Sequence, residues 1–164
     1  MKQTETRTAG VLCNISSLPG PYGVGVFGEE ARSFLDALRE MHFRWWQVLP
    51  FNPLDSMNSP YTSPSAFAGN ILYIDPRDLL RRGLITGEEE ASNRWDGSPY
   101  TAAYDFAKER RLALLKTAFS RVTDALRSEI AAFAEKQEWL ADFSLYMAVK
   151  EANDRKPWWE WPDE

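Results

Sequence analysis

Hydrophobic residues form two short runs in the first third of the chain, separated by a stretch in which apolar residues recur at helical spacing. Residues 9–15 and 45–49 are compact apolar runs, a pattern typical of buried strands. Between them, residues 29–41 place apolar side chains three or four positions apart and begin with two glutamates, as an amphipathic helix does. The pattern predicts a strand–helix–strand unit with parallel strands and a right-handed crossover.

The rest of the chain has a mainly helical period. Asp75 and Pro76 are typical of a helix N-cap and first turn, and Gly83 of a helix end. Residues 85–99 are expected to form a polar linker, followed by helices over 104–126, 127–135 and 138–152. We therefore divide the chain into residues 1–84 and a helical subdomain over residues 85–164. The apolar stripes expected on the first and last of these helices are Leu112, Leu115, Phe119, Val122 and Leu126, and Trp139, Phe143 and Met147.

Residues 50–70 follow the second strand and show neither the three- or four-residue spacing of a helix nor the alternation of a strand. They are rich in Pro, Ser, Asn and Gly, which predicts a long ordered loop at the C-terminal end of a strand, where α/β proteins bind ligands. An aromatic ring such as Tyr61 can stack on the apolar face of a sugar, and Ser59, Asn58 and Asn52 can bind its hydroxyl groups. The alternative is a surface loop fixed by Ser-Pro turns, with Tyr61 and Phe67 filling the core.

Composition narrows the class of function. The formal charge of −5 and the scattered basic residues argue against a nucleic-acid-binding surface. A single cysteine, Cys13, excludes an internal disulfide and is expected to be a small buried hydrophobe. The chain has no apolar run of transmembrane length, and its start lacks the apolar core of a signal peptide, so we expect a cytoplasmic protein that does not bind membranes.

Two further features suggest chemistry but have simpler explanations. Residues 23–28 spell G-x-G-x-x-G, yet Pro19, Gly20 and Pro21 separate these glycines from the preceding strand, and the second strand lacks the acidic residue that would bind a ribose. Asp75 is an acid near the loop, but helix capping accounts for it. We assign no nucleotide, other cofactor or metal.

Three motifs occur in order along the chain. Residues 45–50 (WWQVLP) lead into residues 58–70 (NSPYTSPSAFAGN), residues 15–25 (ISSLPGPYGVG) precede them, and residues 156–162 (KPWWEWP) close the chain. Together these motifs resemble the 4-α-glucanotransferases of glycoside hydrolase family 77, also called amylomaltases or disproportionating enzymes.

The resemblance implies an α/β fold that begins a (β/α)8 barrel. A complete barrel of this kind takes about 250 residues, more than the whole chain has. We therefore expect an N-terminal piece with the first two parallel strands, the crossover helix and a mainly helical insertion, in which the barrel is incomplete. The missing C-terminal part of the barrel would be its partner.

The implied activity is the transfer of α-1,4-glucan segments between maltodextrins by retaining double displacement. The family's catalytic Asp and Glu lie on later strands, so we assign no catalytic residue here. Ser59 and Tyr61 match positions that line the donor side of the cleft. Asn52, Asp55 and Asn70 are further binding candidates that could equally cap turns. Tyr104 aligns only loosely with a family aromatic residue at a secondary glucan site.

The chain departs from the family's pattern at residues 54–57, where many members have glycine and an aromatic, and at Asn14, where His is frequent. The first departure bears on the secondary glucan site. Two hypotheses stay open: a segment of a transferase that is active only with the missing strands, or a non-catalytic, degenerate α-glucan-binding remnant whose helices shield the open strand edges.

Overall fold

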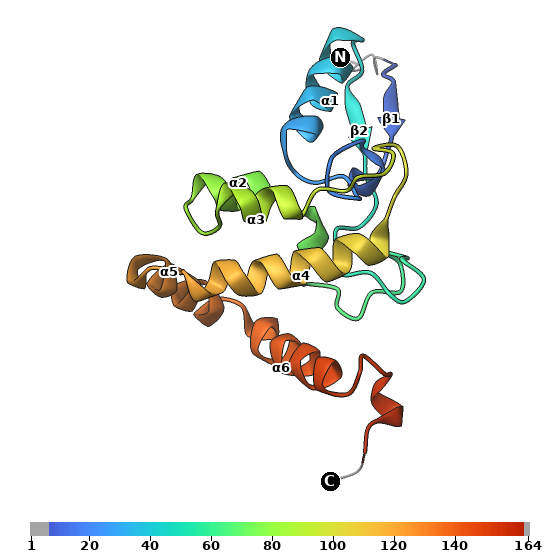
Figure 1. Cartoon of the computed structure of the whole chain (residues 1–164). Coiled ribbons are helices and arrows are strands. Elements are labelled where there is room, and N and C mark those ends of the chain that lie inside the picture. Colours follow the sequence, from blue (N-terminus) through green and yellow to red (C-terminus); the bar gives the residue numbers. More distant parts are fainter. Residues whose placement is uncertain (1–6, 163–164) are drawn as a thin grey trace.

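The computed structural model describes residues 7–162 and contains the predicted strand–helix–strand unit (Figure 1). Strands β1 (Gly10–Leu12) and β2 (Trp45–Gln47) are parallel, with Val11 opposite Trp46, and helix α1 (Glu29–Glu40) connects them. Both strands are shorter than the apolar runs that predicted them, because only three residues of each pair. The order and direction of the unit confirm the prediction.

The two faces of this small sheet differ in burial. Trp46 packs edge-on against Phe34 of α1, with ring centroids 4.9 Å apart, and its indole N–H donates to the Cys13 carbonyl at 2.7 Å. Leu12 and Trp45, each one position away from the paired Val11 and Trp46, point to the other face of the sheet and are 60% and 65% exposed. One face of the sheet is therefore covered by α1, while the other is open among the described residues.

The middle of the chain contains more helix than the sequence predicted. Short 3-10 turns, η1 (Ile15–Ser17) and η2 (Ile71–Tyr73), precede helices α2 (Pro76–Arg81) and α3 (Gly87–Ser92). The prediction of Asp75 as N-cap is confirmed, since its carboxylate accepts from the Arg77 amide at 2.9 Å. The expected linker over residues 85–99 was wrong in part, because Thr86 and Glu89 form a reciprocal capping box that starts α3.

The helix predicted over residues 104–126 ends earlier. Helix α4 (Tyr104–Ser120) stops before Thr123, whose hydroxyl accepts from the Leu126 amide at 3.3 Å and caps α5 (Asp124–Glu135). Of the predicted stripe on α4, Leu115 packs against a buried cluster as expected, but Phe119 is 56% exposed, so the prediction was wrong at that position. The residues of α4 that are buried are Ala107, Arg111, Leu114 and Ala118.

Helix α6 (Glu138–Ala152) has the predicted bounds, and α5 and α6 pack on each other away from the sheet (Figure 1). Their side chains are not buried; Trp139 and Phe143 are in contact, but Met147, expected on the inner face, is 40% exposed. Beyond α6, the turn η3 (Trp158–Glu160) leaves Trp158 and Trp159 exposed.

Two clusters of buried side chains hold the centre of the chain together. Val24 of the loop after β1, Leu72 of η2 and Ala107 of α4 form one of them. The other joins α2, the residues before α3, and α4; its members are Leu79, Leu84, Ile85, Leu114 and Ala118. The division of the chain at residue 84 stays a prediction. None of the described helices has the length and apolar character needed to cross a membrane.

Candidate functional site

The loop over residues 50–70 leaves the C-terminal end of β2 and returns to η2, and its two ends are hydrogen-bonded together. The Asn70 amide donates to the Phe51 carbonyl at 2.7 Å, and the Asn52 side-chain amide donates to the Ala68 carbonyl at 3.3 Å. Asn52 therefore closes the base of the loop. The loop has a defined shape despite its length and its lack of helix or strand.

Asp55 organises the far part of the loop. Its Oδ1 accepts from the backbone amides of Met57 at 2.8 Å and Ser59 at 2.7 Å, and its Oδ2 accepts from the Thr62 hydroxyl. These donors, the Thr62 hydroxyl first, hold the pKa of the Asp55 carboxyl below its ordinary value. Asp55 thus folds the turn that presents its neighbours.

Ser59 and Tyr61 lie two positions apart on this turn and are hydrogen-bonded to each other. The Ser59 hydroxyl accepts from the Tyr61 backbone amide at 3.2 Å, and the Tyr61 side chain is 70% exposed. Phe67 is 73% exposed on the same loop. The alternative in which the loop aromatics fill the core is therefore wrong, because both rings face solvent. An exposed aromatic ring on a hydrogen-bonded loop is suited to stacking on a sugar.

Asn70 occupies a different environment from Tyr61. It is 8% exposed, its Oδ1 accepts from the Leu72 amide at 3.0 Å, and its buried Nδ2 has no hydrogen-bond partner among the described residues. Asn70 lines a cavity of about 290 Å³ together with Phe27, Phe51 and Tyr73, whose rings pack edge-to-face. Of the five predicted binding residues, Asp55, Ser59 and Tyr61 are grouped, while Asn52 and Asn70 lie at the base of the loop.

A hydrogen-bonded group at the end of β1 was missed by sequence reasoning. The buried Ser16 hydroxyl accepts from the Asn14 side-chain amide at 2.7 Å and from the Tyr104 hydroxyl at 2.8 Å. Asn14 also reaches the Tyr73 hydroxyl at 3.5 Å, and burial raises the pKa of Tyr73. Tyr104 therefore ties α4 to the loop after β1. The secondary glucan site suggested for Tyr104 stays a prediction.

The G-x-G-x-x-G motif has a packing explanation. Gly23 has a φ of +77°, a backbone conformation that favours glycine. A Cβ at Gly25 would lie 1.9 Å from the Ile15 carbonyl oxygen, and one at Gly28 would lie 2.1 Å from Oδ2 of Asp75. The glycines at 25 and 28 are thus needed for close approach of other parts of this chain, and no phosphate is required to account for them.

A cluster of charged side chains surrounds the buried ring of Tyr22, and sequence reasoning did not find it. The Tyr22 hydroxyl donates to the Glu90 carboxylate, which also accepts from Arg94, while the guanidinium carbons of Arg77 and Arg111 lie 5.4 and 5.6 Å from the Tyr22 ring centroid. Burial raises the pKa of Tyr22 and lowers the pKa of Arg111 to about 10. This cluster joins α2, α3 and α4 and lies inside the fold.

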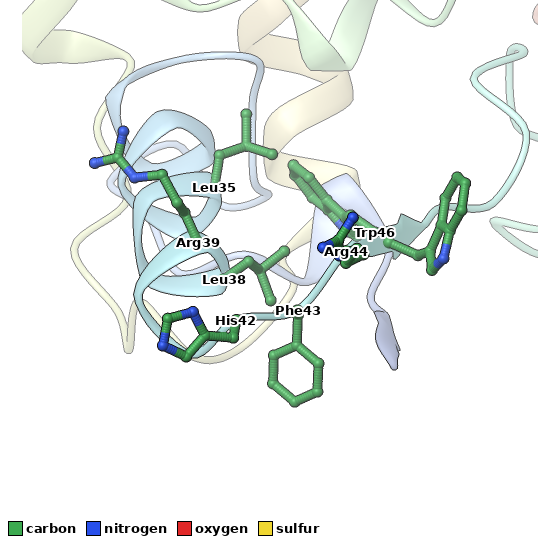
Figure 2. A pocket seen from close by; sticks show the side chains of 8 residues that line it. Leu35, Leu38, Arg39, His42, Phe43, Arg44 and Trp46 are labelled. Carbon is green, nitrogen blue, oxygen red and sulfur yellow. The ribbon is translucent and has the colours of Figure 1, made fainter. Parts of the chain in front are cut away.

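The larger cavity lies at the opposite end of β2 from the loop. It measures about 440 Å³ and is bounded by α1 and by the residues that enter β2 (Figure 2). Ligands of open α/β sheets bind at the C-terminal ends of the strands, so the loop is the better candidate site. In the described part of the chain, no three His, Cys, Asp or Glu side chains are placed to hold a metal ion.

Comparisons with known proteins agree over most of the chain. A family profile described as 4-alpha-glucanotransferase matches residues 13–164. The 4-alpha-glucanotransferase of Aquifex aeolicus is 43% identical over 162 residues, covering 96% of this chain and 32% of that protein. The enzyme of the same description from Thermus thermophilus is also 43% identical over 162 residues, covering 95% of this chain and 31% of that protein.

A solved structure matches nearly the whole chain. The amylomaltase from Streptococcus agalactiae in complex with acarbose is similar with a TM-score of 0.90 and 34% sequence identity, over 96% of this chain and 32% of that chain. This match confirms the predicted fold class, the first two strands of an incomplete (β/α)8 barrel followed by helices. The chain spans about a third of the length of the relatives it matches.

Proposed function

The chain belongs to the 4-alpha-glucanotransferase family, and we propose that it provides the donor-side sugar contacts of an enzyme that transfers α-1,4-glucan segments between maltodextrins. The family match over residues 13–164 supports the class of reaction. The acarbose bound in the similar amylomaltase, an α-glucan analogue, supports the class of ligand. Because the chain matches an N-terminal part of its relatives, the complete activity belongs to the proposal.

The single observation that carries the proposed role is the exposed Tyr61 ring on the loop that leaves the C-terminal end of β2, with the Ser59 hydroxyl hydrogen-bonded to the Tyr61 backbone amide. A glucose ring stacked on the phenol would bury an apolar face, and the hydroxyl of Ser59 would bind a rim hydroxyl of the same sugar. Asp55 and Asn52 act by holding the loop, and Asn70 lines its base.

The reaction itself is a retaining double displacement. A carboxylate attacks the anomeric carbon while a second carboxyl group protonates the leaving glycosidic oxygen, and an acceptor sugar then displaces the enzyme carboxylate. We assign neither carboxylate to this chain, so both would come from the remaining strands of the barrel. The part of this chain would be to orient the donor glucan and exclude water from one side of the cleft.

A mutation in a complete enzyme tests this role. In a chimera in which this chain replaces the matching third of the Aquifex aeolicus enzyme, Tyr61→Ala should weaken donor-side binding by about 1 to 3 kcal/mol, the range for a stacked aromatic. Tyr61→Phe keeps the ring and should lose less. Tyr100→Ala is the matched control, because Tyr100 is 85% exposed and lies outside the loop. Equal catalytic efficiencies for Tyr61→Ala and Tyr100→Ala would assign no sugar contact to Tyr61.

The isolated chain tests the second hypothesis, a non-catalytic glucan-binding protein. We expect no release of glucose or longer maltodextrins from maltotriose above a blank, because the two carboxylates are not provided. Disproportionation by the isolated chain would contradict this expectation. Binding of maltodextrin to the isolated chain, lost in Tyr61→Ala, would support the sugar contact under either hypothesis, since the hydrogen bonds that shape the loop lie within this chain. Cooperative unfolding of the isolated chain would favour the non-catalytic, stand-alone protein.

A further inference from the structure

The carboxylate of Asp55 binds the chain on both sides of Tyr61. Before Tyr61, its Oδ1 accepts from the backbone amides of Met57 at 2.8 Å and Ser59 at 2.7 Å. After Tyr61, its Oδ2 accepts from the Thr62 hydroxyl. We call residues 55–62, joined by these contacts, the Asp55 turn. A single side chain therefore brackets the residue that the proposed function places against the sugar.

The backbone of the Asp55 turn contains an uncommon conformation. Asn58 has a φ of +62°, in the left-handed region that residues other than glycine seldom occupy. The Asn58 amide donates to the Asp55 carbonyl, and the Asp55 amide donates to the Ser59 carbonyl, both at 3.2 Å. The two amides that bind the Asp55 carboxylate make shorter hydrogen bonds than these. We therefore expect the turn to leave this conformation when the carboxylate is removed.

The direction of the Tyr61 ring depends on this backbone. The ring is 70% exposed, so few side chains of the described residues hold it, and the Tyr61 amide donates to the Ser59 hydroxyl at 3.2 Å. A ligand that stacks on the ring binds in proportion to the fraction of molecules in which the turn has the competent conformation. A turn that is already formed also loses less conformational entropy when the sugar binds. The Asp55 turn can thus change the affinity at Tyr61 without touching the ligand.

The contacts of the Asp55 carboxylate leave it little capacity to bind a sugar. An ionised carboxylate offers about four acceptor positions, and three donors from this chain already bind that of Asp55. We propose that Asp55 is a positioning residue of the donor site, which holds the turn so that the Tyr61 ring is ready to stack on a glucose unit, with Thr62 as its partner. This inference rests on the proposed function, in which Tyr61 contacts the donor glucan. Residues 54–57 depart from the family's pattern, so the resemblance does not supply this role.

The experiment uses the chimera in which this chain replaces the matching third of the Aquifex aeolicus enzyme, with acarbose, the compound bound in the similar amylomaltase, as the probe. Calorimetry measures its affinity, and hydrogen–deuterium exchange measures the protection of the amides of residues 57–62. Asp55→Ala should weaken acarbose binding about three- to tenfold, as a competent fraction of roughly a tenth to a third would, and should speed exchange in the turn. Thr62→Val removes one contact and should have a smaller effect. Asp36→Ala is the matched control, because Asp36 is an exposed acid on α1 that pairs with Arg39, and it should change neither quantity.

Further variants separate a positioning role from a sugar contact and from a general loss of stability. Asp55→Asn keeps the Oδ1 acceptor for both amides, and its side-chain amide can donate to the Thr62 hydroxyl oxygen, so it should restore most of the affinity. In a chimera that already carries Tyr61→Ala, Asp55→Ala should have little further effect, because the ring that Asp55 positions is gone. The melting temperature of Asp55→Ala should match that of Asp36→Ala, since the turn lies outside the two buried clusters.

The outcomes that overturn this inference differ from one another. An equal loss from Asp55→Ala with and without the Tyr61 ring would make Asp55 a direct sugar contact and would overturn the positioning role. Exchange and acarbose affinity equal to those of Asp36→Ala would also overturn it. If Tyr61→Ala binds acarbose as tightly as the unsubstituted chimera, the proposed function fails and this inference fails with it. If Tyr61→Ala weakens binding and Asp55→Ala does not, only the inference about Asp55 fails.

Discussion

Asp75 is the residue at which capping and charge burial can be separated by mutation. It is 1% exposed and its carboxylate accepts from the Arg77 amide at 2.9 Å, which caps α2. The same carboxylate accepts from Nε of Arg77 at 3.0 and 3.1 Å, and Arg77 also binds Glu30. Asp75 is thus both the N-cap of a helix and one partner in a buried ion pair.

The two roles predict different losses of unfolding free energy. Asp75→Ala removes the cap, which costs about 1 kcal/mol, and leaves Arg77 without its buried partner, for which losses of about 3 to 5 kcal/mol are usual. Because Glu30 still binds Arg77, we expect a total near the lower figure, about 3 kcal/mol. Asp75→Asn keeps a good N-cap and removes only the charge, so we expect about 1 to 3 kcal/mol.

Urea unfolding followed by tryptophan fluorescence measures these values, with the denaturant slope checked for each variant. Asp78→Ala is the control, because Asp78 pairs with Arg81 on the surface of the same helix and its side chain is 42% exposed. Such a pair contributes about 0 to 1 kcal/mol. If Asp75→Ala destabilised the chain no more than Asp78→Ala, the assignment of Asp75 as a structural cap and ion-pair partner would be refuted.

Two further predictions concern packing and pH. Gly28→Ala should destabilise the chain by about 1 to 3 kcal/mol because its Cβ would displace the Asp75 carboxylate, whereas Gly69→Ala, with no atom within 4 Å, should be tolerated; equal urea midpoints would contradict this. Arg121, with a smaller contribution from the Thr86 backbone amide, lowers the pKa of Glu89 from 4.5 to about 2, so these contacts stabilise the fold above pH 4.5 and cease to do so as pH falls through 2. Arg121→Gln should raise the NMR titration midpoint of Glu89 toward 4.5, and an unchanged midpoint would contradict the pairing.

Short sequence patterns were sufficient to predict the helices and strands whose formation depends mainly on neighbouring residues. The apolar run at residues 45–49 and the amphipathic stretch at 29–41 gave the parallel strands and their helix, because both patterns report burial directly. The pair Asp75-Pro76 gave the start of α2, since capping chemistry is local. The Thr86-x-x-Glu89 capping box was an equally local signal for α3, and reading residues 85–99 as a linker overlooked it.

The buried face of α4 was not available from periodicity. The predicted stripe of large apolar residues included Phe119, but the buried side of α4 is formed by Ala107, Arg111, Leu114 and Ala118. A hydrophobic pattern predicts that an arginine lies on the surface. Arg111 is instead buried against the ring of Tyr22, 89 positions earlier in the chain. Tertiary contacts decided the phase of this helix, which sequence spacing alone cannot report.

The candidate site, too, could be predicted from the sequence only in part. The composition of residues 50–70 located the loop, and the resemblance selected Ser59 and Tyr61, but the sequence left open whether Asp55 binds ligand or caps a turn, and the structure shows that it shapes the turn. All three donors to the Asp55 carboxylate lie within seven positions of it, so this part of the loop does not depend on the rest of a barrel for its form. The sheet face that carries Leu12 and Trp45 is open among the described residues. The polar contacts that shape the far part of the loop are therefore local in the sequence, whereas one face of the strand pair is left without cover among the described residues.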